Sequence, residues 1–211
     1  MISLVLIGGG GHAKVVAAIV GKIGRYQIVG YTAPIAGSAP LNLSYLGTDE
    51  ILPDLLASKR VTGAAIGIGI IEINGKRAAL HRSVAAHGLS LPSIVSPTAV
   101  VNEPARIGNG TVVMDGVVIN PGAMIGELCI VNTNATVEHD CTVGSYSHIA
   151  PGAVLCGGVT VGEETLIGTS ACVLPGLRIA ARCLIGGGAT VTCDLTEPGV
   201  YQGTPARRIR A

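Results

Sequence analysis

The chain has 211 residues, enough for one large domain or two small ones, and a formal net charge of +1 at pH 7. This balance gives no basic field for a nucleic acid and no charged run typical of disorder, and a core of this size does not depend on disulfides or metal ions. Glycine contributes 31 residues and hydrophobic types 48%, yet Phe and Trp are absent and Tyr occurs five times. Small and branched aliphatic side chains must therefore fill the core.

The amino-terminal residues, "MISLVLIGGGGHAKVV", contain a short apolar run without a basic segment before it. Glycines end this run well short of the roughly 20 residues that a membrane span needs. Six cysteines occur without a CxxC pair, which favours reduced thiols over a zinc or disulfide framework. We expect a cytoplasmic protein with no membrane insertion and no bound metal.

The amino-terminal part has the pattern of an α/β domain. The apolar run 2–7 predicts a buried parallel strand, the glycines at 8–11 a turn, and residues 12–20 a helix. Further strands are expected at 26–31 and 61–69, and further helices at 48–59 and 76–88. Only about three strands fit, so residues 1–91 are interpreted as a small Rossmann-like domain.

From residue 95 onward the sequence has a period of six. Seventeen successive positions at this spacing are aliphatic. They are Val95, Val101, Ile107, Val113, Ile119, Ile125, Val131, Val137, Val143, Ile149, Leu155, Val161, Ile167, Val173, Ile179, Ile185 and Val191. Such a repeat predicts a hexapeptide parallel β-helix over residues 92–211, with three short faces and about 18 residues in each coil.

A second slot, four residues after each aliphatic position, holds mostly small residues. Cys129, Cys141 and Cys183 fall in this slot and are expected to be small buried hydrophobic residues. Cys141 also follows the acidic run "VEHD", so it is kept as a candidate nucleophile. In that run Glu138 and Asp140 flank His139, in an otherwise apolar stretch. A solvated turn is one interpretation of this cluster, and a catalytic group is the other.

Six stretches resemble the hexapeptide-repeat acyltransferases: "IGGGGHAKVV", "LGTDEIL", "NTNATVEHDCTVGSYSHIAPGAVLCGGVTVG", "GTSACVLPG", "IGGGATVTCD" and "VYQGTPARRIR". The chain is most similar to the branch that joins a small nucleotide-sugar-binding domain to a left-handed β-helix. That branch contains acetyltransferases of nucleotide-linked 4-amino-4,6-dideoxysugars and of sialic acid. The resemblance implies a homotrimer with acetyl-CoA as co-substrate and active sites at the subunit interfaces.

Acetyl transfer from a thioester requires a positioned acceptor, a base and stabilisation of the oxyanion. An imidazole, with an ordinary pKa of about 6.5, can accept a proton at neutral pH. The resemblance implies that His139 is this base and that Asp140, or alternatively Glu138, orients it.

The same resemblance implies contacts with the cofactor. His148 would lie against acetyl-CoA, the backbone around Gly157 would contact the thioester carbonyl, and Thr169 and Gly187 would line the pantetheine channel. Arg207, in a basic tail with Arg208 and Arg210, would meet CoA phosphates. His148 as a local turn residue and the tail as a merely solvated segment remain alternatives.

Near the amino terminus, Gly8, Gly10 and Ala13 loosely match a dinucleotide fingerprint. An NAD site expects an acidic residue about 20 positions further on, and residues 28–40 contain none. The resemblance instead implies that Gly10, Gly11 and His12 hold the nucleotide sugar, with Gly67 as a further contact. Relatives commonly carry Asp where this chain has Ala33, so the identity of the nucleotide stays open.

The leading prediction is an N-acetyltransferase acting on a UDP- or GDP-linked 4-amino-4,6-dideoxysugar in bacterial surface-glycan biosynthesis. O-acetylation of sialic acid or a related sugar by the same groups is the close alternative. A zinc carbonic anhydrase needs three histidines, whereas the repeat region has only His139 and His148. A purely structural β-helix would explain the hexads but not the "EHD" run.

Overall fold

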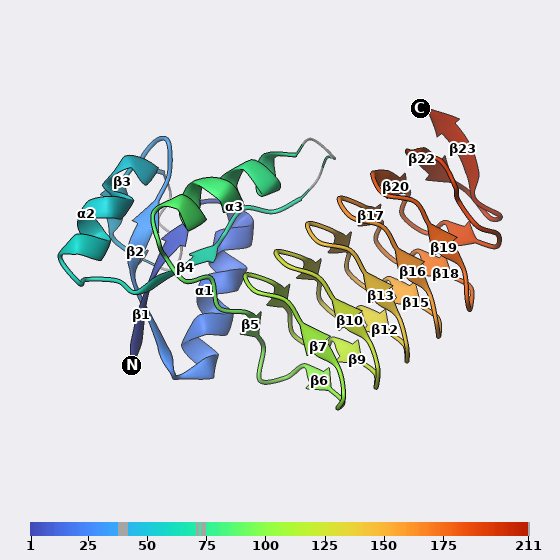
Figure 1. Ribbon diagram of the computed structural model, residues 1–211, viewed down its shortest axis with the longest axis horizontal. Helices are drawn as coiled ribbons and strands as arrows, with labels where there is room; N and C mark the ends of the chain where they lie inside the picture. Colours follow the sequence, from blue (N-terminus) through green and yellow to red (C-terminus); the bar gives the residue numbers. More distant parts are fainter. Residues whose placement is uncertain (38–41, 71, 73–74, 211) are drawn as a thin grey trace. The chain divides into compact units, whose positions relative to one another are not determined.

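A computed structural model describes residues 1–37, 42–70, 72 and 75–210. The chain divides into two compact units, of which the first contains Met1–Gly69 and Lys76–Pro97 and the second Ile70–Gly75 and Thr98–Ala211. Figure 1 shows helices beside a small sheet in the first unit and a stack of flat coils in the second. The domain boundary expected from the sequence, between residues 91 and 92, stays a prediction.

The first unit is a small parallel sheet with helices. Its strands are β1 (Ile2–Ile7), β2 (Tyr26–Thr32), β3 (Tyr45–Gly47) and β4 (Gly63–Ile66), in the order β3-β2-β1-β4, and all neighbours run parallel. Its helices are α1 (Gly11–Ile23), α2 (Leu52–Ala57) and α3 (Lys76–Ala86), with a 3-10 helix η2 (Asp49–Ile51) before α2. The Rossmann-like arrangement predicted from the sequence is confirmed.

Two details of this unit differ from the prediction. The strand expected at 61–69 is only β4, because the residues after Ile66 leave the sheet. The strand β3 was not predicted at all, since three residues are too few to display an alternating pattern. It adds one parallel strand at the edge of the sheet, next to β2.

The carboxyl ends of the parallel strands meet at one edge of the sheet. The glycine loop, defined as Gly8–Gly11, follows β1, and Ala33 follows β2. The Gly8 N–H donates to Thr32 O at 2.8 Å, and the Gly67 N–H donates to Ile7 O at 2.7 Å. In such sheets ligands bind outside the carboxyl ends where the strand order reverses, which here is beside β1.

The second unit is a parallel β-helix, and its strands are mostly two residues long. β5 (Ile94–Val95) precedes these strands in the chain. The strands of the second unit are β6 (Val100–Val101), β7 (Arg106–Ile107), β8 (Val112–Val113), β9 (Val118–Ile119), β10 (Met124–Ile125), β11 (Ile130–Val131), β12 (Thr136–Val137), β13 (Thr142–Val143), β14 (His148–Ile149), β15 (Val154–Leu155), β16 (Thr160–Val161), β17 (Leu166–Ile167), β18 (Cys172–Val173), β19 (Arg178–Ile179), β20 (Cys183–Ile185), β21 (Thr190–Val191), β22 (Gly199–Gln202) and β23 (Arg207–Arg210).

The strands stack in three sheets that form the three faces of the coil. One is ordered β19-β16-β13-β10-β7, a second β21-β18-β15-β12-β9-β6, and the third contains β23-β22-β20-β17-β14-β11-β8. Each strand of the coils pairs in parallel with the strand one coil further on, as Thr136 does with Val154. Inward aliphatic side chains from Val113 to Val191 are at most 4% exposed. The predicted left-handed hexapeptide-repeat β-helix is confirmed.

Each coil turns at corners where one residue has a positive φ. Glycine supplies many of these positions, but Asn134 (φ 56°), Asp140 (φ 59°) and Ser170 (φ 55°) supply others. A side chain other than glycine costs about 1–2 kcal/mol in this conformation, and Asn and Asp tolerate it best because they hydrogen-bond locally. A carboxylate at position 140 is therefore compatible with the turn.

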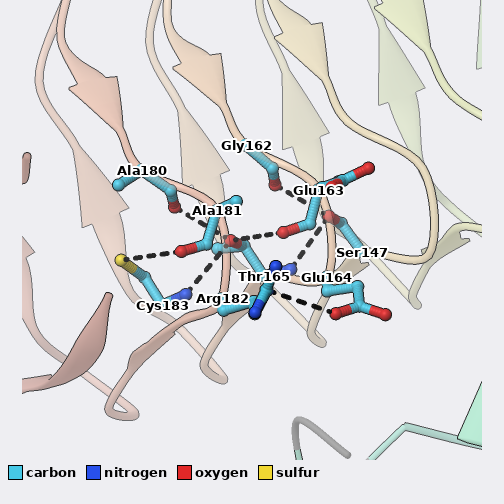
Figure 2. Close-up of polar contacts among 9 residues, drawn as sticks. All are labelled: Ser147, Gly162, Glu163, Glu164, Thr165, Ala180, Ala181, Arg182 and Cys183. Atoms are coloured by element: carbon cyan, nitrogen blue, oxygen red, sulfur yellow. Dashed lines mark hydrogen bonds and ion pairs between the residues drawn. The ribbon is translucent and has the colours of Figure 1, made fainter. Parts of the chain in front are cut away.

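A column of small polar residues runs inside one corner of the coils. Figure 2 shows part of it, where the Ser147 hydroxyl donates to Gly162 O at 3.1 Å and the Thr165 hydroxyl to Ala180 O at 3.1 Å. The backbone N–H of Thr165 donates to the Ser147 hydroxyl at 3.1 Å, which links one coil to the next. These buried hydroxyls thus satisfy backbone groups at the turns, where no strand can do so.

The carboxyl-terminal residues close the stack with a hairpin, in which β22 and β23 pair antiparallel. Within the described part of the chain, no helix is long and apolar enough to cross a membrane. No group of three or more His, Cys, Asp or Glu side chains that could hold a metal ion occurs among the residues that the structure describes.

Candidate functional site

The candidate active site lies at the corner that follows β12. The His139 Nδ1 atom lies 2.9 Å from Asp140 Oδ2, and the two side chains are 63% and 72% exposed. The Asp140 N–H donates to Pro121 O at 3.1 Å, so the backbone at this corner is held by the preceding coil. The two residues predicted to act together are thus in direct contact.

The contact with Asp140 sets the protonation properties of His139. The hydrogen bond to the Asp140 carboxylate raises the pKa of His139 above its ordinary value of 6.5, partial desolvation opposes this shift, and the charges of Asp140 and Glu138 add to it. A carboxylate accepts a proton from Nδ1, so Nε2 keeps its lone pair in the neutral ring. Asp140 is therefore the hydrogen-bond partner of the imidazole, whereas Glu138 acts on it only through its charge.

Gly157 lies one coil further on, directly against the His139 ring. A Cβ atom at residue 157 would lie 2.5 Å from His139 Nε2 and 2.7 Å from Cε1, well inside contact distance. The next residue, Gly158, donates its N–H to His139 O at 2.8 Å. Among the described residues, no acceptor for the Gly157 N–H is found. The backbone of Gly157 therefore lies against the basic nitrogen of His139.

His148 lies on the face of the coil formed by β14, away from this corner. Its Nδ1 lies 2.8 Å from Ile70 O and its Nε2 lies 3.0 Å from the Asn132 amide nitrogen. Because a carbonyl only accepts, Nδ1 carries the proton and Nε2 accepts from Asn132. In this structure the ring fixes residue 70 against the β-helix, and its contact with acetyl-CoA stays a prediction.

The other predicted cofactor residues lie at two further places. Thr169 and Gly187 occupy successive coils at a corner on the opposite side of the β12 sheet from His139, and the Gly188 N–H donates to Thr169 O at 2.8 Å. Arg207 is exposed in the terminal hairpin, where its Nη1 donates to Ala206 O at 3.1 Å. Their roles toward the cofactor stay predictions.

Cys141 is not available as a nucleophile. Its side chain is 0% exposed, its thiol donates to Cys156 O at 3.1 Å, and burial raises its pKa. Because the thiolate is the reactive form, this environment makes the sulfur inert. The interpretation of Cys129, Cys141 and Cys183 as small buried residues is correct, since all three are 0% exposed.

The fold requires glycine at two of the four positions of the glycine loop and does not require it at the other two. Gly8 has φ +106°, and a Cβ on Gly9 would lie 2.8 Å from the Tyr31 ring, so the fold needs glycine at both positions. A Cβ on Gly10 or Gly11 would meet nothing within 4 Å. Neither the backbone nor the packing demands glycine there. Open space at the start of α1 is what a ligand approaching the helix N–H groups would require.

The surroundings of Gly67 and His12, the other two predicted substrate contacts, do not point to a ligand. A Cβ on Gly67 would lie 2.7 Å from Ala13 Cβ, so close packing of β4 against α1 already explains this glycine. His12 is half-buried near the start of α1, beside Gly69. Contact of Gly67 and His12 with a substrate stays a prediction.

Two residues near these sites were missed by the sequence reasoning. Asn132 fixes the tautomer of His148, and an asparagine in a repeat turn gives no signal of that kind. Tyr45 is an exposed aromatic residue beside the carboxyl end of β2. The sequence shows that tyrosines are few, but it could not place Tyr45 at this edge because the three residues of β3 have no pattern.

Comparisons with known proteins agree with both units. The model of the "PglD N-terminal domain" matches residues 3–81, and that of "Bacterial transferase hexapeptide (six repeats)" matches residues 104–139 and 122–157. A search of curated protein sequences gives no match.

Similar solved structures extend over nearly the whole chain. A histidine-to-asparagine variant of perosamine N-acetyltransferase from Caulobacter crescentus, in complex with CoA and GDP-perosamine, has 37% identity and a TM-score of 0.92, covering 98% of this chain and 96% of that one. The acetyltransferase domain of PglB from Neisseria gonorrhoeae has 33% identity and a TM-score of 0.91, covering 99% and 100%. WeeI from Acinetobacter baumannii, with 22% identity over 98% and 100% and a TM-score of 0.84, shares the fold. The chain therefore belongs to the nucleotide-amino-sugar acetyltransferase branch of the hexapeptide-repeat transferases.

Proposed function

We propose that this protein transfers the acetyl group of acetyl-CoA to the amine of a nucleotide-linked 4-amino-4,6-dideoxysugar, as a step in surface-glycan biosynthesis. The observation that carries the proposal is the His139–Asp140 pair at 2.9 Å, with the Gly157 backbone against the same imidazole. Further support comes from the relative of 37% identity that is solved with CoA and GDP-perosamine, and from its variants in which one histidine is replaced by asparagine or alanine.

In the proposed reaction the neutral sugar amine attacks the thioester carbonyl of acetyl-CoA. The amine adds to the carbonyl carbon with formation of the C–N bond, which places negative charge on the carbonyl oxygen, and the C–S bond then breaks to release CoA. His139 Nε2 accepts the proton that the amine loses, and the resulting imidazolium donates it to the departing CoA thiolate. Asp140 stabilises the imidazolium through Nδ1, because a carboxylate beside it favours the charged ring.

The backbone donor at Gly157 is proposed to stabilise the negative charge on the carbonyl oxygen. Donors aimed at an oxygen where charge develops commonly contribute more to rate than any other group. Thr169, Gly187 and Arg207 are proposed to hold the pantetheine and phosphates of CoA, and His148 to lie against the same cofactor. Gly10, Gly11, His12 and Gly67 are proposed to hold the nucleotide sugar.

We further propose that the protein is a homotrimer with active sites between subunits. The exposure of His139 (63%) and Asp140 (72%) supports this, because acetyl transfer benefits from a site that excludes water. A neighbouring copy would cover the corner and complete the site. Native mass spectrometry should give three times the mass of the 21.2 kDa chain, and a monomer with full activity would contradict the proposal.

The experiment that tests the function is an acetyl-transfer assay read by mass spectrometry. Acetyl-CoA would be incubated with UDP-, GDP- and dTDP-linked 4-amino-4,6-dideoxysugars and, separately, with sialic acid. We expect one acetyl group on the amine of at least one nucleotide sugar, together with stoichiometric free CoA. Acetylation of sialic acid alone would favour the O-acetyltransferase alternative, and no product from any acceptor would contradict the proposal.

The glycine loop gives a prediction with a matched control. Gly11→Ala places a methyl group in the open space at the start of α1, and we expect it to raise KM for the nucleotide sugar about tenfold, as expected for loss of a hydrogen bond to a charged group. Gly21→Ala adds the same methyl to the same helix, also in open space, and should leave KM unchanged. Both changes should raise stability by about 0.5–1 kcal/mol. Equal KM values for the two variants would show that the loop does not meet the substrate.

The raised pKa of His139 gives a prediction about pH dependence. The base must be neutral, so kcat/KM should rise with pH through an apparent pKa above the ordinary 6.5. Asp140→Asn keeps a residue that tolerates the positive φ but removes the charge. The substrate amine titrates identically in both proteins, so a difference between the two profiles comes from the enzyme. For the variant, kcat/KM should rise at a lower pH than for the wild type and should reach a lower maximum. Superimposed profiles would contradict the role of Asp140.

A further inference from the structure

Tyr45 is an unusual residue in this protein because it is an aromatic residue that is partly exposed. The chain has no Phe or Trp, so aromatic side chains are scarce, and Tyr45 is 38% exposed at the start of β3. Strand β3 pairs with β2, and Tyr45 lies opposite Tyr31. The ring therefore lies near the edge of the sheet where the strands end and where ligands of such sheets bind.

The Tyr45 ring is held in place on this surface. Its hydroxyl donates to Ala33 O at 3.1 Å, and its ring centre lies 5.5 Å from that of Tyr31 at an interplanar angle of 54°. Tyr31 is buried and its ring supports Gly9 of the glycine loop. An aromatic ring that is fixed from behind loses little entropy when a ligand stacks on its exposed side.

Ala33 connects this ring to the glycine loop. Its Cβ lies 3.6 Å from the position that a Cβ on Gly9 would occupy, so the side chain of residue 33 faces the loop. A carboxylate at this point in related sheets bonds the ribose of a dinucleotide. Here a methyl group stands in its place, and the nearby carboxylate of Asp49 is bonded at 2.5 Å to the Thr32 hydroxyl. Between the loop and Tyr45, residue 33 therefore contributes a methyl group and no carboxylate.

We propose that Tyr45, with Ala33 beside it, forms the surface on which the nucleobase of the nucleotide-sugar substrate stacks. The inference rests on the proposed function and adds to it the residue that binds the base. With the diphosphate at the start of α1, the nucleoside extends past the end of β2 toward β3. Every base has a π-face and stacking tolerates all of them, so the site should discriminate weakly among bases.

The test is equilibrium binding of GDP, UDP, dTDP and inorganic pyrophosphate by calorimetry, for wild type, Tyr45→Leu and Tyr45→Phe. The leucine keeps apolar bulk but removes the ring, and the phenylalanine keeps the ring but removes the hydroxyl bond to Ala33. We expect Tyr45→Leu to lower the affinity for GDP, UDP and dTDP about tenfold, as loss of one stacked base does. Tyr45→Phe should stay within about threefold of wild type, and pyrophosphate should bind all three proteins equally.

Kinetics with the nucleotide sugar should show a raised KM for Tyr45→Leu, with kcat and the KM for acetyl-CoA unchanged. Unchanged nucleotide affinity in a folded Tyr45→Leu protein would overturn the inference and leave the proposed function intact. Equal weakening by leucine and phenylalanine would also overturn it, because the hydroxyl bond rather than the ring would then matter. If the wild type binds no nucleotide yet acetylates a free sugar, the proposed function itself fails, and the inference fails with it.

Discussion

His139→Ala is expected to lower kcat for acetyl transfer by about 10²- to 10⁴-fold, the usual contribution of a positioned general base. The KM for acetyl-CoA should change little, because the ring is proposed to act on the amine and not to bind the cofactor. The side chain is 63% exposed in the single chain, so its removal takes little packing from the subunit and the protein should unfold at nearly the same temperature. Steady-state kinetics with mass-spectrometric detection of the product measure the effect.

Two further substitutions separate the base from its surroundings. Glu138→Gln removes a nearby charge that has no hydrogen bond to the imidazole and should reduce activity only slightly. An exogenous imidazole should restore part of the activity of His139→Ala, since the substitution leaves a space with the volume of the lost ring. A His139→Ala protein with wild-type kcat would show that the amine loses its proton to another acceptor, and the assignment of the base would be wrong.

Gly157→Ala is the second prediction with a large effect, about a hundredfold loss of kcat/KM, because small displacements of a reacting group can cost this much. The added methyl would lie 2.5 Å from His139 Nε2, so the imidazole must turn away from Gly157 and strain or break its bond to Asp140. The pKa of His139 should then fall toward its ordinary value. Nuclear magnetic resonance titration of the imidazole measures this shift directly.

A double-mutant cycle tests whether the clash with the ring is the cause. In a His139→Ala background the methyl at residue 157 no longer meets an imidazole, so the second substitution should change neither activity nor unfolding temperature further. Residue 157 does not have a positive φ, so alanine is compatible with its backbone. Additive losses in the cycle would show that the added methyl acts through something other than the His139 ring, such as the proposed contact of Gly157 with the thioester.

The β-helix could be predicted almost completely, because one aliphatic residue in every six faces the same interior. The pairing of His139 with Asp140 followed from adjacency in the sequence and from the resemblance. The hydrogen bond between Asp140 and Nδ1 could be seen only in the structure, since it depends on the conformation of the corner at which residue 140 has a positive φ. A repeat pattern states which residues point inward but not how the exposed ones turn.

In the first unit, prediction succeeded for long elements and failed for short ones. The apolar strand β1 and the helix α1 are evident, whereas β3 has three residues and no pattern. Tyr45, which lies on β3, could not be placed for the same reason. The contact of Gly67 with a ligand stays a prediction, and the structure adds a packing reason for this glycine, because a Cβ there would lie 2.7 Å from Ala13 Cβ.

The stacking of coils also determines how this active site tolerates change. His139 and Gly157 belong to successive coils, so their separation follows the interval between hydrogen-bonded strands, about 4.8 Å, and does not depend on how side chains fill the interior. Inward substitutions can therefore alter stability without altering catalytic distances. Loss or gain of six residues between them would instead move one group to a different corner. The repeat length therefore sets the spacing of the two groups, and the number of coils at either end of the stack does not affect it.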